Sequence, residues 1–116
     1  MMKPSHIILP SIAALILAAS LPALAAAPTV KTLAEDSTMQ VLDVVEHPGD
    51  VSAAAKRTGN VIYVISGGTL ERTFADGTKT TTTRKAGEAA IITETRPYGV
   101  KNVGTTTVHL IEVVKK

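Results

Sequence analysis

Few side chains in this 116-residue sequence belong to the types that perform nucleophilic or metal chemistry. Cysteine is absent, which excludes a thiolate nucleophile and a thiolate metal site. Two histidines, His47 and His109, lie beyond the apolar N-terminal stretch, and either could pair with Glu46 or Glu94 in a small metal site. A metal centre needs several converging ligands, so we expect one turn histidine and one strand-face histidine. We therefore predict no metal and no cofactor.

Motifs for covalent catalysis and phosphate binding do not occur either. There is no G-x-S-x-G nucleophile elbow, and SGGT at 66–69 lies between two predicted strands rather than before a helix. The chain has 12 Lys and Arg against 10 Asp and Glu, no basic cluster beyond pairs, and 3% aromatic residues, so we expect no nucleic-acid partner. No motif in the sequence identifies a reaction, so we do not predict an enzyme.

The first 25 residues have the pattern of a secretory signal peptide. Lys3 supplies a positive charge, residues 7–24 are almost wholly apolar, and small residues follow, with a predicted cut after Ala25. The alternative is an uncleaved membrane anchor, but Pro10 and Pro22 interrupt the ~20 apolar residues that a spanning helix needs. We expect a periplasmic or secreted protein with no membrane attachment after cleavage.

The rest of the chain reads as short strands and turns without a convincing helix. Residues 26–37 form a lead-in segment or edge strand, and 51–59 are ambiguous because three alanines also suit a helical turn. Further strands are predicted at 38–47, 60–66, 69–74, 79–85, 88–93, 100–104 and 106–114. Turns about every 8–12 residues predict a single all-β domain, a sandwich or a barrel.

Two dipeptides mark the sharpest predicted turns. Gly67-Gly68 and Asp76-Gly77 are both typical of two-residue β-hairpins, so we predict a hairpin at each. Between them TLERTF alternates, which places Arg72 on the same face as the apolar residues of that strand.

The spacing of several residues matches two motifs of a known family, G(X)5HXH(X)3–4E(X)6G and G(X)5PXG(X)2H(X)3N. The segment NVIYVISGG fits the end of the first motif, with Asn60 at its Glu and Gly67 at its last Gly, and Gly49 of HPGD fits its leading Gly. The second motif fits without a gap, with Gly87, Thr93, Thr95, Tyr98 and Asn102 at its five defined positions. Over 39–114 the chain thus resembles the small single-domain cupins, which implies a cupin-like jelly-roll β-barrel at 38–116.

The resemblance also implies that the metal site of this family is lost. Cupins that bind metal use three histidines and a glutamate, and these positions fall at Ala54, Lys56, Asn60 and Tyr98. A one-residue shift in the first motif gives Ala53 and Ala55 at the two histidine positions instead, which is no better.

The same alignment with the cupin motifs implies a pocket lined by Lys56, Asn60 and Tyr98. These side chains would point inward from neighbouring strands. A cation, an amide and a hydroxyl in an apolar cavity would suit a small polar or anionic ligand. The alternative is that Lys56 turns to solvent while Asn60 and Tyr98 only satisfy each other.

Two surface features remain open. Arg57, Arg96 and Lys101 could ring the mouth of the barrel and favour an anion, or they could be ordinary surface charges. The threonine-rich strand at 79–85 could pair with a second subunit in a homodimer, or it could be a hydrated outer face.

We therefore predict an exported cupin-domain protein that lacks the usual metal ligands and binds a small molecule without catalysis. Two alternatives stay open: a structural or partner-binding barrel, and a cupin enzyme with a rearranged metal site at His47 or His109. The fold by itself does not choose among them, because function depends on the site.

Overall fold

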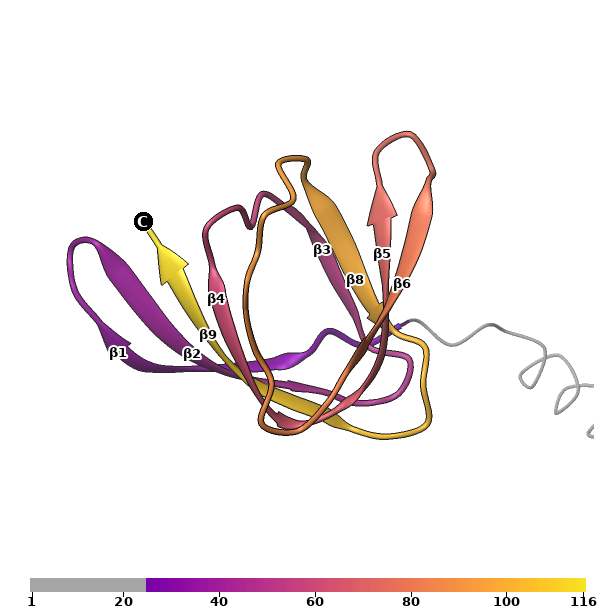
Figure 1. Cartoon of the computed structure of the whole chain (residues 1–116), viewed down its shortest axis with the longest axis horizontal. Helices are drawn as coiled ribbons and strands as arrows, with labels where there is room; N and C mark the ends of the chain where they lie inside the picture. Colours follow the sequence, from indigo (N-terminus) through magenta and orange to yellow (C-terminus); the bar gives the residue numbers. More distant parts are fainter. Residues whose placement is uncertain (1–24) are drawn as a thin grey trace, which may run out of the picture.

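The computed structural model describes residues 25–116, which form nine β-strands in two antiparallel sheets (Figure 1). The predicted signal peptide lies, except for Ala25, outside the described residues. No helix in the described part of the chain is long and apolar enough to cross a membrane. The all-β prediction is confirmed for residues 25–116.

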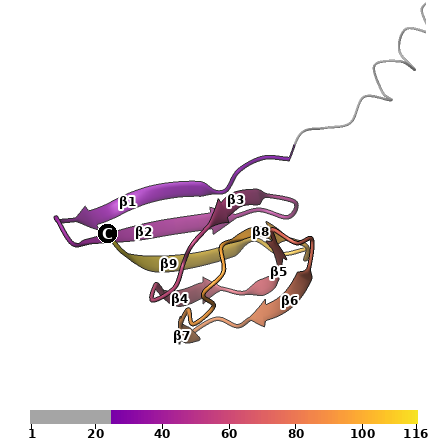
Figure 2. The ribbon, with the colours of Figure 1, turned by 90° about the horizontal axis from the view of Figure 1, so that it is seen from above.

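Five strands form the larger sheet, and four form the smaller one. The five-stranded sheet has the order β1 (Thr29–Glu35), β2 (Met39–Glu46), β9 (Val108–Lys115), β4 (Val61–Ser66) and β7 (Ala89–Ile91). The four-stranded sheet has the order β3 (Val51–Ala55), β8 (Tyr98–Asn102), β5 (Gly68–Phe74) and β6 (Lys79–Arg84). Figure 2 shows β1, β2, β9 and β4 following one another across the larger sheet. The lead-in segment thus contributes the edge strand β1.

The prediction of a closed barrel is wrong, because the two sheets face each other without joining into one. Among the described residues, no edge strand of one sheet is hydrogen-bonded to an edge strand of the other. The edge strand β7 has only three residues and pairs only with β4, so it offers little backbone for closure. The fold is a two-layered jelly roll with free edges at β1, β7, β3 and β6.

Alternation along the strands buries one face of each sheet against the other. In β4 Ile62 and Val64 are buried, whereas Val61 and Tyr63 point outward. The buried cluster between the sheets consists of Val44, Ile62, Leu70, Phe74, Ile92, Tyr98, Val108 and Leu110. This core holds the inward-facing side chains of the site in place.

The hairpin predicted at Gly67-Gly68 is wrong, because these residues carry the chain from one sheet to the other. β4 belongs to the five-stranded sheet and β5 to the four-stranded sheet. Glycine is needed here because other chain segments come very close. A Cβ atom on Gly67 would lie 2.1 Å from the Arg84 carbonyl oxygen, and one on Gly68 would lie 2.8 Å from Val108 Cγ2.

The hairpin predicted at Asp76-Gly77 is confirmed, and it joins β5 to β6. Gly77 has a φ of +87°, which favours glycine, and its amide donates to the Phe74 carbonyl over 2.9 Å. The ambiguous stretch 51–59 contains strand β3 rather than a helical turn, because it pairs with β8. The register of this pairing shifts between Ser52 and Ala55.

Candidate functional site

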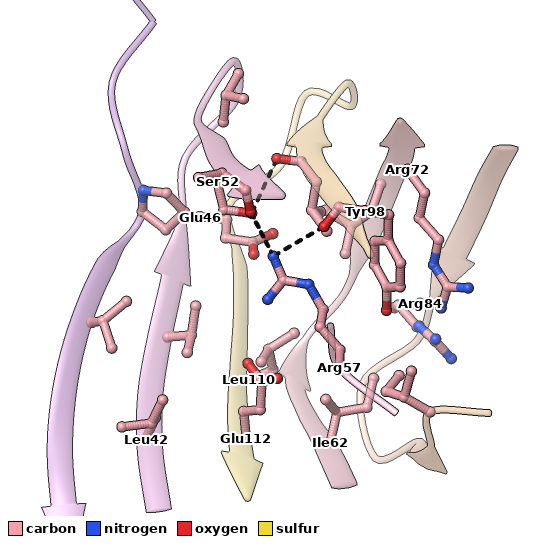
Figure 3. Close-up of a pocket in the computed structure, with 18 of the residues that line it drawn as sticks. Leu42, Glu46, Ser52, Arg57, Ile62, Arg72, Arg84, Tyr98, Leu110 and Glu112 are labelled. Carbon is pink, nitrogen blue, oxygen red and sulfur yellow. Dashed lines mark hydrogen bonds between the residues drawn. The ribbon is translucent and has the colours of Figure 1, made fainter. Parts of the chain in front are cut away.

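A cavity of about 350 Å³ lies between the two sheets (Figure 3). Its apolar lining includes Leu42, Val44, Ile62, Leu70 and Leu110. The segment ahead of β1 contributes Ala27 and Pro28, and the Val51 amide anchors this segment by donating to the Ala26 carbonyl over 2.8 Å. A cavity of this size and character suits a small organic molecule.

Three arginines from the four-stranded side surround the ring of Tyr98 in this cavity. Arg72 on β5 and Arg84 on β6 point inward from their strands, and Arg57 reaches in from the loop between β3 and β4 (Figure 3). The Cζ atoms of Arg72 and Arg57 lie 4.5 and 5.3 Å from the ring centroid of Tyr98. Both distances fall within the range of cation–π interactions. The ring thus fixes two guanidinium groups at the cavity.

Arg57 is held firmly by the polypeptide around it. Its Nη2 atom donates to the Ala53 carbonyl over 3.1 Å, to Ser52 Oγ over 3.3 Å and to the Tyr98 carbonyl over 3.5 Å. Its Nε atom is buried and has no hydrogen-bond partner among the described residues. The Arg57 side chain is therefore fixed through its Nη2 atom, while the Nε–H donor makes no hydrogen bond to the described residues.

Glu46, the last residue of β2, brings a carboxyl group into the same cavity and is only 7% exposed. Burial raises the pKa of Glu46 to about 7; the Arg57 charge opposes this rise, and the negative charges of Glu112 and Asp50 add to it. The Oε2 atom of Glu46 is buried without a hydrogen-bond partner in the part of the chain that the structure describes. Glu46 therefore changes charge near neutral pH.

Two further groups complete the polar lining. Glu112 on β9 accepts a hydrogen bond of 2.9 Å from Asn60 Nδ2, which orients its carboxylate. Tyr98 on β8 is 2% exposed, and burial raises the pKa of its hydroxyl, although the charges of Arg72 and Arg57 oppose the rise. The hydroxyl therefore stays protonated at neutral pH. It points toward the end of the Arg84 side chain (Figure 3).

Several solved structures have a fold similar to that of this chain. A cupin domain from Bordetella pertussis Tohama I is 16% identical, and the match covers 82% of this chain and 99% of that domain with a TM-score of 0.70. An uncharacterized conserved protein with a double-stranded β-helix domain from Klebsiella pneumoniae is 25% identical, with 85% of each chain covered and a TM-score of 0.60. This chain has the cupin fold. The resemblance predicted from the two motifs is confirmed at the level of the fold.

An RmlC-like cupin family protein with a double-stranded β-helix fold, from Methanocaldococcus jannaschii, also resembles this chain. It is 15% identical, with 83% of this chain and 86% of that chain covered and a TM-score of 0.58. A scan against protein-family models finds no match, and a search of curated proteins finds none either. Sequence identities this low support a shared fold but not a shared function. The function of the site therefore depends on the residues that line it.

The structure brings only one of the three predicted ligand-binding residues to the cavity of this cupin fold. Tyr98 lines the cavity, whereas Asn60 is buried beside it and contacts it only through Glu112. Lys56 is exposed and does not line the cavity. The chain leaves β3 at Ala55, and the next inward residue is Arg57, so the expected inward direction of Lys56 is not observed.

The predicted ring of cations at the mouth is also only partly present. Arg57 lines the cavity, but Lys101 is exposed and absent from its lining. Arg96 lies over the ring of Phe74 at 3.8 Å and pairs with Glu94 at 3.1 Å. Two cavity arginines, Arg72 and Arg84, were not predicted as site residues, although the alternation of TLERTF already placed Arg72 on the apolar face.

The residues of this cupin cavity do not fit a divalent metal ion. Three guanidinium groups repel a cation, and no histidine lines the cavity. Of the positions that the family uses for metal, Ala54 and Lys56 are exposed. In the described part of the chain, no group of three or more His, Cys, Asp or Glu could hold a metal ion.

The two histidines each face a single carboxylate instead. His47 Nδ1 lies 3.5 Å from Asp50 Oδ2 in the turn after β2, and His109 Nε2 lies 2.6 Å from Asp43 Oδ1 between β9 and β2. Neither histidine lines the cavity. A rearranged metal site at either would need further ligands.

Asn102, at the last position of the second cupin motif, connects the cavity wall to the loop after β8. Its Nδ2 atom donates to the carbonyl oxygens of Glu46 and Thr106, both over 2.9 Å, and its Oδ1 accepts from the Gly104 amide over 3.0 Å. The side chain is 1% exposed, so water cannot replace these bonds. Asn102 therefore holds the backbone of Glu46 in position.

We expect Asn102→Ala to lower the free energy of unfolding by about 2–4 kcal/mol, because it leaves buried backbone groups without partners. Urea unfolding followed by circular dichroism measures this loss. Gln40→Ala is the control, since Gln40 makes one exposed side-chain bond to Glu35, and it should cost under about 1 kcal/mol. Equal losses in the two variants would contradict the role given to Asn102.

Proposed function

We propose that this cupin-fold protein binds a small anionic organic molecule between its sheets and catalyses no reaction. The observation that carries the proposal is the convergence of Arg57, Arg72 and Arg84 around Tyr98. Among the described residues, neither Arg57 nor Arg72 forms a salt bridge, whereas Arg84 pairs with Glu88 at 3.6 Å. The three guanidinium groups outnumber the two carboxyl groups of the cavity lining, Glu46 and Glu112, and such an excess of arginine favours a carboxylate or a phosphate.

The apolar lining supports a ligand with a hydrocarbon part as well as a charge. Leu42, Ile62 and Leu110 offer apolar contact surface in the same cavity as the arginines (Figure 3). Binding of this kind requires no metal, in keeping with the loss of the family's metal ligands that the motifs predict. If residues 1–25 direct export as their sequence indicates, the ligand is met in the periplasm or outside the cell.

The test compares two six-carbon probes, hexanoate and 1-hexanol, in titrations of the 15N-labelled protein followed by NMR. Hexanoate should shift the amide signals of cavity residues and 1-hexanol should not. Arg72→Met should weaken hexanoate binding by about tenfold or more, because a hydrogen bond to a charged group contributes about 1.5–3 kcal/mol.

The matched control is Arg96→Met, which removes an arginine paired with Glu94 and outside the cavity. Hexanoate affinity should change less than twofold in this variant. Equal binding of hexanoate and 1-hexanol, or equal losses in Arg72→Met and Arg96→Met, would contradict an anion site at these arginines.

A further inference from the structure

We infer that the ligand is a hydroxy acid, whose carboxylate binds Arg72 and Arg84 and whose hydroxyl bridges Glu46 and Arg57. This inference rests on the proposed function and adds the chemical class of the ligand. The inference follows from two buried side-chain atoms, Glu46 Oε2 and Arg57 Nε. Neither atom has a hydrogen-bond partner among the described residues.

The two atoms are complementary in hydrogen bonding. Glu46 Oε2 is an acceptor when the carboxyl group is ionised, and Arg57 Nε is a donor. A buried polar atom without a partner costs about 1–3 kcal/mol, and more when the group is charged. Both residues line the same cavity. A hydroxyl group can serve the two together, because it donates one hydrogen bond and accepts others.

The surroundings keep these two atoms in place for a ligand. The Glu46 backbone is fixed by β2–β9 pairing with Val108 and by the bond from Asn102. The far end of Arg57 is tied to Ser52 and Ala53. Glu46 and Arg57 themselves form no salt bridge within 4.0 Å in the described structure. The ligand hydroxyl of this inference would lie between these two side chains.

The charges of the cavity disfavour an ammonium or a second carboxylate as the bridging group. An ammonium could donate to Glu46, but it would lie among the positive charges of Arg57, Arg72 and Arg84. A second carboxylate would meet the acceptor of Glu46 and repel it. A neutral hydroxyl avoids both conflicts.

The carboxylate subsite lies on the other sheet from Glu46. Arg72 and Arg84 belong to β5 and β6, whereas Glu46 belongs to β2, and Arg57 lies between them in Figure 3. The Tyr98 hydroxyl, which stays protonated, points toward Arg84 and can donate to the same carboxylate. The ligand must therefore carry its two polar groups at separate positions.

The test compares hexanoate with the positional isomers of hydroxyhexanoate in NMR titrations at pH 8. At this pH most Glu46 carboxyl groups are ionised, since their pKa is about 7. At least one isomer should bind tenfold or more tightly than hexanoate, because only the hydroxyl satisfies both buried atoms. Glu46→Leu should reduce this preference to less than threefold, and the control Glu71→Leu, which alters a residue absent from the cavity lining, should keep it.

The outcomes separate this inference from the proposed function. If hexanoate and every hydroxy isomer bind with equal affinity, the hydroxyl subsite is wrong and the anion site stands, with water bridging Glu46 and Arg57. If no acid binds, the proposed function itself fails. The comparison of ligands uses the unmodified protein, so it remains decisive if Glu46→Leu does not fold.

Discussion

Gly67→Ala should destabilise this protein by about 4 kcal/mol or more, the largest effect that we expect from any single methyl group. The added Cβ would lie 2.1 Å from the Arg84 carbonyl oxygen and 2.9 Å from the Arg84 carbonyl carbon. These are backbone atoms at the end of β6, where Gly68 pairs with Arg84, so no side-chain rotation relieves the overlap. Urea unfolding followed by circular dichroism measures the loss.

The control is Gly87→Ala, at a glycine with a φ of +84° and nothing within 4 Å of the added Cβ. Left-handed backbone strain should cost only about 1–2 kcal/mol there. Gly67→Asn provides a second test, because Asn-Gly is a favoured hairpin turn and a hairpin at 67–68 would tolerate it. The structure predicts that Gly67→Asn is as harmful as Gly67→Ala. A stable Gly67→Asn variant would show that β4 and β5 form a hairpin after all.

Glu46→Gln should make the protein more stable at pH 8, by about 2 kcal/mol, and change its stability little at pH 5. Burial raises the pKa of Glu46 in the folded state to about 7, whereas the unfolded value is near 4.5. Between these values the folded state binds more protons than the unfolded state, so stability falls as pH rises. The full shift corresponds to about 3 kcal/mol once the carboxylate is ionised, and glutamine removes this cost while remaining polar.

Thermal and urea unfolding of both proteins between pH 5 and pH 8.5 measure the difference. Comparing the curves isolates Glu46, because the other titratable groups are the same in both proteins. Glu71→Gln is the control, since Glu71 lies outside the cavity, and its difference from the unmodified protein should not grow between pH 5 and pH 8. A Glu46→Gln difference that is constant across this range would mean that Glu46 titrates normally.

The strands could largely be predicted from the sequence, because each is encoded by its own residues. β4, β5 and β6 lie within a residue of the predicted stretches, and the Asp76-Gly77 hairpin follows from the φ that its glycine must adopt. β3 could not be assigned from the sequence and stayed ambiguous, because its alanines have little preference of their own and its structure comes from pairing with β8.

The residues of the cavity were harder to predict than the strands that carry them. Tyr98 was identified through the second motif, whose register has no gap, and it lines the cavity. Lys56 was assigned to the cavity through the first motif. This motif includes the segment between Ser52 and Ala55, where the register of the β3–β8 pairing shifts. A shift of one residue exchanges the two faces of a strand, so Arg57 is directed inward and Lys56 outward.

The sequence by itself determined local features: the strand-forming stretches, the Asp76-Gly77 turn and the spaced glycines of a cupin. Only the tertiary structure decided which sheet each strand joins and which side chains meet in the cavity. Alternation distinguishes the two faces of a strand but does not say what lies opposite either face. Gly67-Gly68 illustrates this limit, because the dipeptide suits a hairpin locally, yet the close approach of Arg84 and Val108 makes it the crossing between two sheets.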